Sequence, residues 1–218
     1  LGWVLNLAAR RVFRPRAFDA TVTCCYPWVN WFSRLARRNG GPRHIFVTQN
    51  GDWPCLRTNS EYRFFDCDGV VCTNPEYFER QRGRYTAALI PNGVDPEIFR
   101  PAGEAEAYSD PRIPDDRPIV LMAAALTPTK RVADGIKAIA LVPSVFALIV
   151  GDGPLRGEIA ELCSRLLPNR HLMLGSVPRE RMASVFRRGD VFLHMSREEP
   201  FGIVYLEAAA SGLPIVAH

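Results

Sequence analysis

Short apolar runs alternate with stretches of helical periodicity along most of this chain. Apolar runs bounded by Gly, Pro, Asn or Asp are typical of buried strands, and apolar residues at i, i+3 and i+4 are typical of amphipathic helices. The expected strands cover residues 18–25, 44–48, 68–73, 85–90, 118–125, 145–150, 171–174, 190–195 and 213–217. The expected helices cover residues 2–13, 28–38, 76–82, 132–141, 178–188 and 203–210. Strands that alternate with helices predict parallel sheets covered on both faces, which is an α/β fold.

The alternation is interrupted once, by a polar stretch rich in Pro, Gly and Asp. It begins with the residues PNGVD at 91–95 and continues to Asp116. This composition is typical of a linker between domains. The sequence therefore predicts a first domain over residues 1–92, a linker over 93–116 and a second domain over 117–218.

The most specific stretch is EEPFGIVYLEAAASGLPIVA at residues 198–217. Glu199 and Glu207 are separated by seven residues, with Phe201-Gly202 between them. The expected order of elements around them is strand, Gly-containing loop, helix and strand. In such a unit the start of the helix directs unpaired N–H groups toward the carboxyl edge of the sheet, where a phosphate can bind. Carboxylates beside that point can accept hydrogen bonds from vicinal hydroxyls, so the pattern indicates a nucleotide-sugar.

This stretch resembles the Glu, seven residues, Glu signature of the retaining glycosyltransferases of family 4, which have the two-domain GT-B architecture. The PNGVD segment resembles that family's crossover between its two Rossmann-like domains. The resemblance implies that residues 1–92 are the C-terminal part of the acceptor-side domain and that 117–218 belong to the donor-binding domain. The chain is therefore expected to be an internal fragment in which both domains and both parallel sheets are incomplete.

The activity implied by the resemblance is transfer of a sugar from a nucleoside diphosphate sugar to an acceptor hydroxyl, with retained anomeric configuration. The enzyme class is that of a hexosyltransferase-like glycosyltransferase. By family likeness Glu199 contacts the donor sugar and Glu207 the ribose hydroxyls, while Val177 contacts the base through its backbone. The N–H groups around Phe201 and Gly202 are expected to stabilise the diphosphate.

A second candidate region is the loop after the expected strand 118–125. Relatives usually carry an Arg there and a Lys five residues later; here the two positions are Ala125 and Lys130, and Arg131 can supply the missing charge. Two adjacent cations at the start of a helix oppose its dipole, which favours diphosphate binding over a solvated surface. Lys130 and Glu199 are the candidate catalytic residues.

Two further loops contain candidate donor contacts. Gly151 and Gly153 come directly after a buried strand, and either let the backbone approach the donor or make a tight turn. No acidic residue ends the next strand, as a dinucleotide site would require. Relatives often place a sugar-contacting His where this chain has Asn50, so Asn50 is a candidate sugar contact, with a plain turn as the alternative.

Composition narrows the cofactors and the cellular setting. The six Cys show no CxxC pair and no metal-type spacing, which favours reduced thiols in a cytoplasmic protein. Neither a metal ion nor a bound cofactor is expected, because cationic side chains and the dipole of the helix can neutralise the leaving group. There is no apolar run of about 18 residues of the kind that spans a membrane.

Charge is distributed unevenly along the chain. Residues 1–92 contain 13 Lys and Arg against 7 Asp and Glu, and residues 93–218 contain 14 against 16. The excess in the first part suits an anionic acceptor or the inner face of a membrane, with a solvated face as the alternative. Likewise, the expected helix 2–13 either packs on the first domain or lies on a membrane. Basic and aromatic residues are not interleaved, so nucleic acid is not an expected partner.

Three other functions remain open from the sequence. A nucleotide-sugar epimerase or a phosphorylase would share the architecture, although neither Lys130 nor Lys137 has the context of a pyridoxal-phosphate lysine. A binding module that holds a nucleotide-sugar without turnover would tolerate the departures at Ala125 and Asn50. The acceptor itself is a sugar, a lipid-linked compound or a small molecule.

Overall fold

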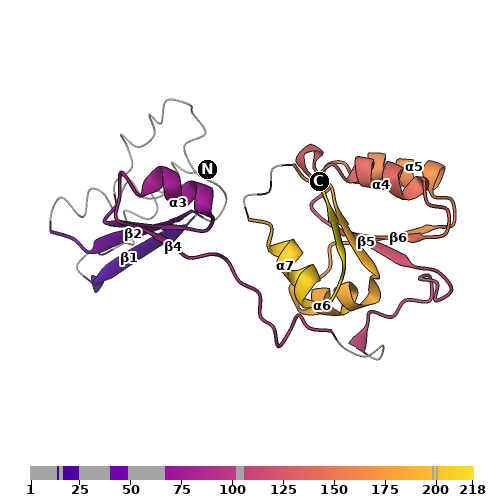
Figure 1. Ribbon diagram of the computed structural model, residues 1–218, viewed down its shortest axis with the longest axis horizontal. Coiled ribbons are helices and arrows are strands. Elements are labelled where there is room, and N and C mark those ends of the chain that lie inside the picture. The colour runs from indigo at the N-terminus through magenta and orange to yellow at the C-terminus, as the bar shows by residue number, and fades with distance from the viewer. Residues whose placement is uncertain are drawn as a thin grey trace. The chain divides into compact units, whose positions relative to one another are not determined.

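A computed structural model describes residues 14, 17–24, 40–48, 67–101, 106–197, 199 and 201–218. The chain divides into two compact units, Leu1–Asn92 and Gly93–His218, and each contains a parallel sheet (Figure 1). The expected helices 2–13 and 28–38 lie outside the described residues, as does Asn50. No helix within the described ranges is both long and apolar enough to cross a membrane.

The first unit contains a four-stranded parallel sheet in the order β1-β2-β3-β4. Its elements are β1 (Ala20–Cys24), β2 (Arg43–Thr48), β3 (Gly69–Cys72), α3 (Pro75–Gln81) and β4 (Ala87–Leu89). Helix α3 begins where the sequence indicates, because the Asn74 side chain accepts a hydrogen bond from the Tyr77 N–H at 2.9 Å and Pro75 occupies the first turn. Tyr77 packs with Phe46 and Val70 in the core of this unit.

The second unit contains a five-stranded parallel sheet in the order β7-β6-β5-β8-β9. Its strands are β5 (Ile119–Ala123), β6 (Phe146–Val150), β7 (His171–Gly175), β8 (Val191–His194) and β9 (Ile215–Ala217). Its helices are the 3₁₀ turn η5 (Pro128–Lys130), α4 (Val132–Ala140), α5 (Arg156–Leu166), α6 (Arg179–Arg188) and α7 (Ile203–Ala210). Among the α-helices of this unit, α5 has no counterpart in those expected from the sequence.

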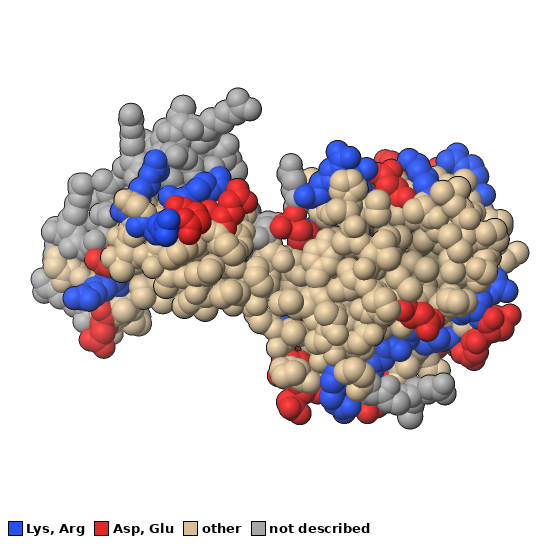
Figure 2. Space-filling view, in the orientation of Figure 1, with Lys and Arg blue, Asp and Glu red and all other residues tan. Residues whose placement is uncertain are grey.

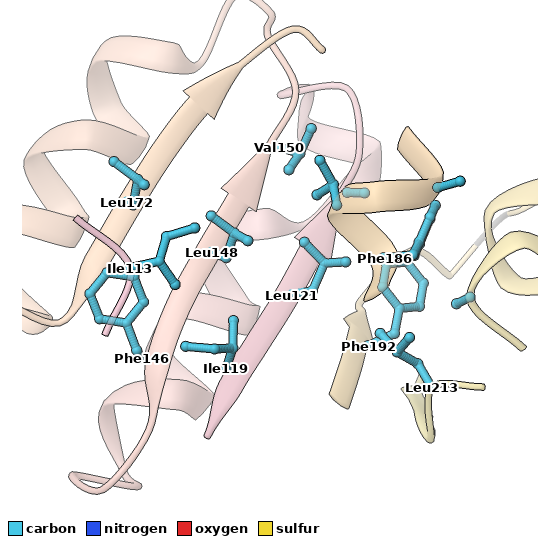
Figure 3. Packing of buried hydrophobic residues seen from close by; sticks show 14 of the residues in the cluster. Ile113, Ile119, Leu121, Phe146, Leu148, Val150, Leu172, Phe186, Phe192 and Leu213 are labelled. Carbon is cyan, nitrogen blue, oxygen red and sulfur yellow. The ribbon is translucent and has the colours of Figure 1, made fainter. Parts of the chain in front are cut away.

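Helices cover both faces of this sheet, α4 and α5 on one side and α6 and α7 on the other (Figure 1). Leu121 on β5 packs in the same cluster as Phe186 of α6, whereas the next residue, Met122, packs with Ile136 of α4. Figure 3 shows the first of these clusters, with Ile119, Leu121, Phe146, Leu148 and Leu172 side by side on the sheet. Burial on both faces explains why the strands are continuous apolar runs.

The segment expected to be a linker packs on the second unit. Phe99 and Ile113 are 2% and 5% exposed and belong to the same core cluster as Phe186. At the end of α6, Arg187 donates to the carbonyls of Ile98 at 2.7 Å and Arg100 at 3.1 Å. Residues of 93–116 therefore contribute to the core of the second unit, and a description of the segment as a plain linker is incomplete.

Charged side chains of the described surface are largely mixed in sign. Arg80 on α3 pairs with Glu76 at 3.3 Å, and Arg82, directly after the helix, pairs with Glu79 at 2.8 Å. Figure 2 shows Lys and Arg beside Asp and Glu on the visible face of the second unit. The described part of residues 1–92 contains five of its 13 Lys and Arg, so the charge excess expected for an anionic partner remains a prediction.

Strand order determines where a ligand can bind in the second unit. From β5 the chain continues outward through β6 to β7, then crosses back to β8, which pairs with β5 on its other side. The loops that leave β5 and β8 therefore diverge in opposite directions. In open α/β sheets a crevice forms at the carboxyl ends of two such strands, and ligands bind there.

Candidate active site

Lys130 and Glu199 meet at the carboxyl ends of β5 and β8. Lys130 ends the η5 turn after β5, and Glu199 lies in the loop after β8. The Lys130 Nζ donates to Glu199 Oε2 at 2.5 Å, with side chains 24% and 19% exposed. The two residues are 69 positions apart in the chain, and the strand order brings them together.

A third polar side chain, His194, joins this pair from the last position of β8. Its Nε2 lies 3.3 Å from Glu199 Oε2, and the residue is 3% exposed. A carboxylate can only accept, so Nε2 carries the proton in this contact. No role was predicted for His194 from the sequence. The available signal was a polar residue at the end of an otherwise apolar strand, five positions before Glu199.

The electrostatics of this cluster result from burial and from close charges. Burial raises the pKa of Glu199, but the hydrogen bonds and charges of Lys130 and His194 outweigh it, so the pKa falls below its usual value. Burial lowers the pKa of His194 below its usual value of 6.5, and Glu199 only partly opposes the shift. At neutral pH the cluster therefore consists of an ammonium, a carboxylate and a neutral imidazole.

The start of α7 lies directly beside Glu199. Gly202 has a φ of 72°, and a Cβ there would lie 2.4 Å from the Tyr205 ring and 2.9 Å from Glu199 Cγ. Only glycine fits both the conformation and the space. No side chain caps this helix start, so N–H groups of its first turn are left for an anion.

The adjacent cation, Arg131, has a different partner. Its Nε and Nη2 lie 2.8 and 2.7 Å from Asp134 Oδ2, one turn further along α4. Arg131 itself adopts a left-handed conformation with a φ of 49° at the junction of η5 and α4. The structure thus joins Lys130 to Glu199 and Arg131 to Asp134.

Glu207 lies on α7, half-buried, two turns from the Glu199 loop. Burial raises the pKa of its carboxyl, and the charge of Arg179 partly opposes this shift. Its carboxylate has no hydrogen bond to the described residues, which leaves it available to a ligand. Val177 precedes α6 and packs partly buried against the core cluster of Phe186.

Gly151 and Gly153 permit a close approach between two loops of the chain itself. A Cβ on Gly151 would lie 1.9 Å from the Ala124 carbonyl oxygen, and one on Gly153 would lie 2.6 Å from that of Leu126. The Leu126 N–H donates to the Asp152 carbonyl at 2.9 Å. Both glycines therefore hold the loops after β5 and β6 together, and a direct contact with the donor remains a prediction.

In the described ranges, no group of three or more His, Cys, Asp or Glu side chains is arranged to hold a metal ion. Ala125, at the position where relatives carry an Arg, is exposed. Asn50 lies outside the described residues, so its predicted sugar contact is untested.

The family of this chain is decided by its match to known proteins. The family model described as "Glycosyl transferases group 1" matches residues 104–218, which is more than half of the chain and contains Lys130, Glu199 and Glu207. The chain belongs to the glycosyl transferases group 1 family. The expected relationship to family 4 glycosyltransferases is thereby confirmed.

Individual members of the family agree with this assignment. The GDP-mannose-dependent alpha-(1-6)-phosphatidylinositol monomannoside mannosyltransferase of Mycolicibacterium smegmatis is 32% identical over 205 residues, which cover 84% of this chain and 54% of that protein. The D-inositol 3-phosphate glycosyltransferase of the same organism is 33% identical, over 75% of this chain and 41% of that protein. The chain therefore spans about half the length of the curated relatives it matches.

Solved structures agree on the fold. Anabaena Alr3699/HepE, in complex with UDP and glucose, superposes with a TM-score of 0.77 at 20% identity. The superposition covers 98% of this chain and 62% of that chain. It confirms the expected GT-B type α/β fold with two parallel sheets.

Proposed function

We propose that this chain of the glycosyl transferases group 1 family is part of an enzyme that transfers a sugar from a nucleoside diphosphate sugar to an acceptor hydroxyl. The transfer retains the anomeric configuration. The observation that carries the proposal is the pairing of Lys130 with Glu199 at the divergence of the β5 and β8 loops, beside the uncapped start of α7. A cation and a helix start suit a diphosphate, and a carboxylate suits sugar hydroxyls.

The proposed chemistry is electrostatic. The bond between the anomeric carbon and the diphosphate oxygen breaks, and its electron pair leaves with the diphosphate. The acceptor hydroxyl oxygen bonds to the same face of that carbon, and its proton passes to the departing diphosphate oxygen. Lys130 and the N–H groups near Phe201 and Gly202 stabilise the negative charge that develops. Glu199 contacts the donor sugar, Glu207 binds the ribose hydroxyls, and the Val177 backbone contacts the base.

We assign the main role in diphosphate binding to Lys130 rather than Arg131. Lys130 Nζ lies beside Glu199, next to the start of α7, whereas two nitrogens of Arg131 donate to Asp134 on α4. The Nη1 of Arg131 is buried without a partner among the described residues, so Arg131 can still assist. Because the ammonium and the helix start can neutralise the leaving group, the proposed reaction requires no metal ion.

The relatives suggest which substrates to test. Their names specify GDP-mannose as one donor, and phosphatidylinositol monomannoside or D-inositol 3-phosphate as acceptors or products. Both of the latter carry an inositol phosphate group, and the predicted basic excess of residues 1–92 suits an anionic acceptor. We therefore propose an acceptor that carries a phosphate group.

The test is transfer of radiolabelled sugar from GDP-mannose and UDP-glucose to inositol phosphates and to phosphatidylinositol in vesicles. Transfer to the acceptor, with a product anomer equal to that of the donor by NMR, supports the proposal. Conversion of the donor to its epimer without acceptor would instead indicate an epimerase. Donor binding by calorimetry without any turnover would indicate a binding module.

A further inference from the structure

We propose that His194 is a positioning residue, which holds the Glu199 carboxylate in place when Lys130 turns to the donor diphosphate. This inference rests on the proposed function, because it concerns the moment at which the donor binds. Neither the signature around Glu199 and Glu207 nor the Lys130 loop includes His194.

Two donors share one oxygen of Glu199. Lys130 Nζ and His194 Nε2 both donate to Oε2, at 2.5 and 3.3 Å, and Oε1 has no hydrogen bond from the described residues. A diphosphate at the start of α7 offers Lys130 a partner of higher charge than a single carboxylate. Once Lys130 turns to it, His194 is the described side chain that still holds Glu199, and Oε1 stays free for a sugar hydroxyl.

The imidazole ring is held far more rigidly than the ammonium. The ring stacks on Phe192, with centroids 5.9 Å apart and an interplanar angle of 18°. The Tyr205 ring meets it edge-on at 5.0 Å and 84°. Lys130 carries its charge on a flexible four-carbon stem, so it can change partners at little cost, whereas His194 cannot move without repacking two aromatic rings. A fixed donor keeps the carboxylate in one orientation.

The protonation state of His194 also suits this role. The titratable groups that face its ring are Glu199 from the β8 loop, Lys130 from the β5 loop and Tyr205 from α7. A neutral imidazole donates through Nε2 without placing a second positive charge beside the Lys130 ammonium. Lys130 then remains the one cation of this three-residue cluster, and its charge is available to bind the diphosphate.

A double-mutant cycle tests whether His194 acts through Glu199. His194→Leu replaces the hydrogen-bond donor with an apolar side chain, and His194→Gln keeps an N–H near the same position. We expect His194→Leu to lower kcat by about tenfold, as for a lost hydrogen bond to a charged group, with nucleoside diphosphate affinity unchanged. We expect His194→Gln to restore most of the rate, and His194→Leu to have no further effect in a Glu199→Ala background.

His171 provides the matched control. It begins β7, at the opposite edge of the sheet, and its Nδ1 lies 2.9 Å from the Leu167 carbonyl oxygen. His171→Gln is expected to leave kcat unchanged. Parental turnover in His194→Leu, or an equal loss from His194→Leu with and without Glu199, would overturn the proposal, because the second result indicates a purely structural role.

A readout without catalysis separates this inference from the proposed function. NMR titration of the full chain is expected to show a neutral His194 protonated at Nε2, with a lower pKa in Glu199→Ala because the carboxylate favours the charged ring. On addition of UDP or GDP, in separate titrations, the Nε2–H signal should persist. A protein that transfers no sugar but shows these signals would refute the proposed function alone. A titration of His194 that is indifferent to Glu199 would refute the contact itself.

Discussion

In both units an Asp before one strand makes the same pair of hydrogen bonds with the neighbouring strand, although the strand orders of the two sheets differ. In the first unit, Asp68 accepts from the His44 N–H at 2.7 Å while its own N–H donates to the His44 carbonyl at 2.7 Å. In the second, Asp190 accepts from the Ile119 N–H at 2.8 Å and donates to the Ile119 carbonyl at 2.9 Å. Each pair of hydrogen bonds joins the start of one strand to its parallel neighbour and satisfies backbone groups at the amino ends of the strands.

The two sheets differ at the carboxyl ends of their strands. The described strands of the first unit lie in chain order from β1 to β4, whereas the second unit reverses direction between β5 and β8. The reversal separates two exit loops and leaves space between them. The candidate site therefore lies in the unit whose strand order reverses.

Two buried histidines show the same contrast. His44 lies near the start of β2, with Nδ1 and Nε2 at 2.8 and 3.1 Å from the hydroxyls of Thr21 and Thr23. His194 lies at the end of β8 and contacts the carboxylate of Glu199. The ring of the first histidine contacts hydroxyls of the neighbouring strand, and the ring of the second contacts a carboxylate of the candidate site. Position along the strand thus distinguishes a histidine at the amino end of the first sheet from one at the candidate site.

The largest expected effect is on turnover when Glu199 is changed. Glu199→Gln should lower kcat by about a hundredfold if one transition-state contact of roughly 2.7 kcal/mol is lost, while nucleotide binding stays nearly intact. Steady-state kinetics with calorimetry measure both quantities. Turnover at the parental rate would remove Glu199 from the mechanism and would weaken the distinction between the two sheets.

The next effect concerns the charge at Lys130. Lys130→Met should weaken nucleoside diphosphate binding by roughly 1.5 to 3 kcal/mol and leave nucleoside binding unchanged, because only the phosphates face the ammonium. The matched control is Lys137→Met, on the same loop-helix segment but 62% exposed and paired with Asp134. Equal losses for nucleoside and nucleoside diphosphate would contradict the assignment.

A smaller effect is expected at Glu207. Glu207→Gln should raise the donor KM by about tenfold and weaken binding of the bare nucleotide, with kcat little changed, because a ribose contact is made equally in the ground and transition states. Glu158→Gln, on the exposed side of α5, serves as the control. A fall in kcat at constant KM would show that Glu207 acts on the reacting sugar instead.

Stability should respond to pH through His194. Its pKa in the folded chain lies below the usual 6.5, so the unfolded chain binds more protons as pH falls below that value, and stability decreases. The thermal midpoint of the parent should therefore fall more than that of His194→Gln as the pH is lowered below about 6.5. Glu199 responds only at lower pH, because its pKa is below its usual value of 4.5. Identical pH profiles for parent and variant would contradict the shift.

The smallest expected effect is that of removing divalent ions. Transfer should be unchanged in EDTA, since Lys130 and the start of α7 supply the positive charge that a metal would otherwise provide. Activity is measured before and after chelation, and then with Mg²⁺ or Mn²⁺ restored. Loss of activity in EDTA, with recovery on either ion, would show that the reaction requires a divalent metal ion in addition to Lys130 and the start of α7.

Local pattern was sufficient to predict most elements of the described chain. Helix α7 covers residues 203–210 as expected, because Gly202 and Ser211-Gly212 mark its ends. Helix α5 was missed after the loop-forming GDGP at 151–154, although Ile159 and Cys163 have helical spacing and are buried. Periodicity and turn chemistry act over a few residues, so a sequence reports them directly.

Residue types and their sequence context also predicted side chains of the candidate site. Glu199, Glu207 and Lys130 were selected from their sequence context, and the structure brings Glu199 and Lys130 into contact. The packing of Phe99 on Phe186 of α6, with ring centroids 6.0 Å apart, was not predicted, because the two residues lie far apart in the chain. Hydrophobic residues in a loop-like stretch do not reveal which surface they will bury.

Which cation pairs with which carboxylate, in contrast, was decided only by the tertiary structure. The sequence places Lys130 and Arg131 side by side and cannot tell which of them faces Glu199 and which faces Asp134. The left-handed turn at Arg131 and the adjacency of β5 and β8 separate the two cations. His194 meets Glu199 through the conformation of the loop after β8, because the two residues are five positions apart. Strand order is a non-local property, set by packing of whole layers, and the contacts across it exist only once the sheet has formed.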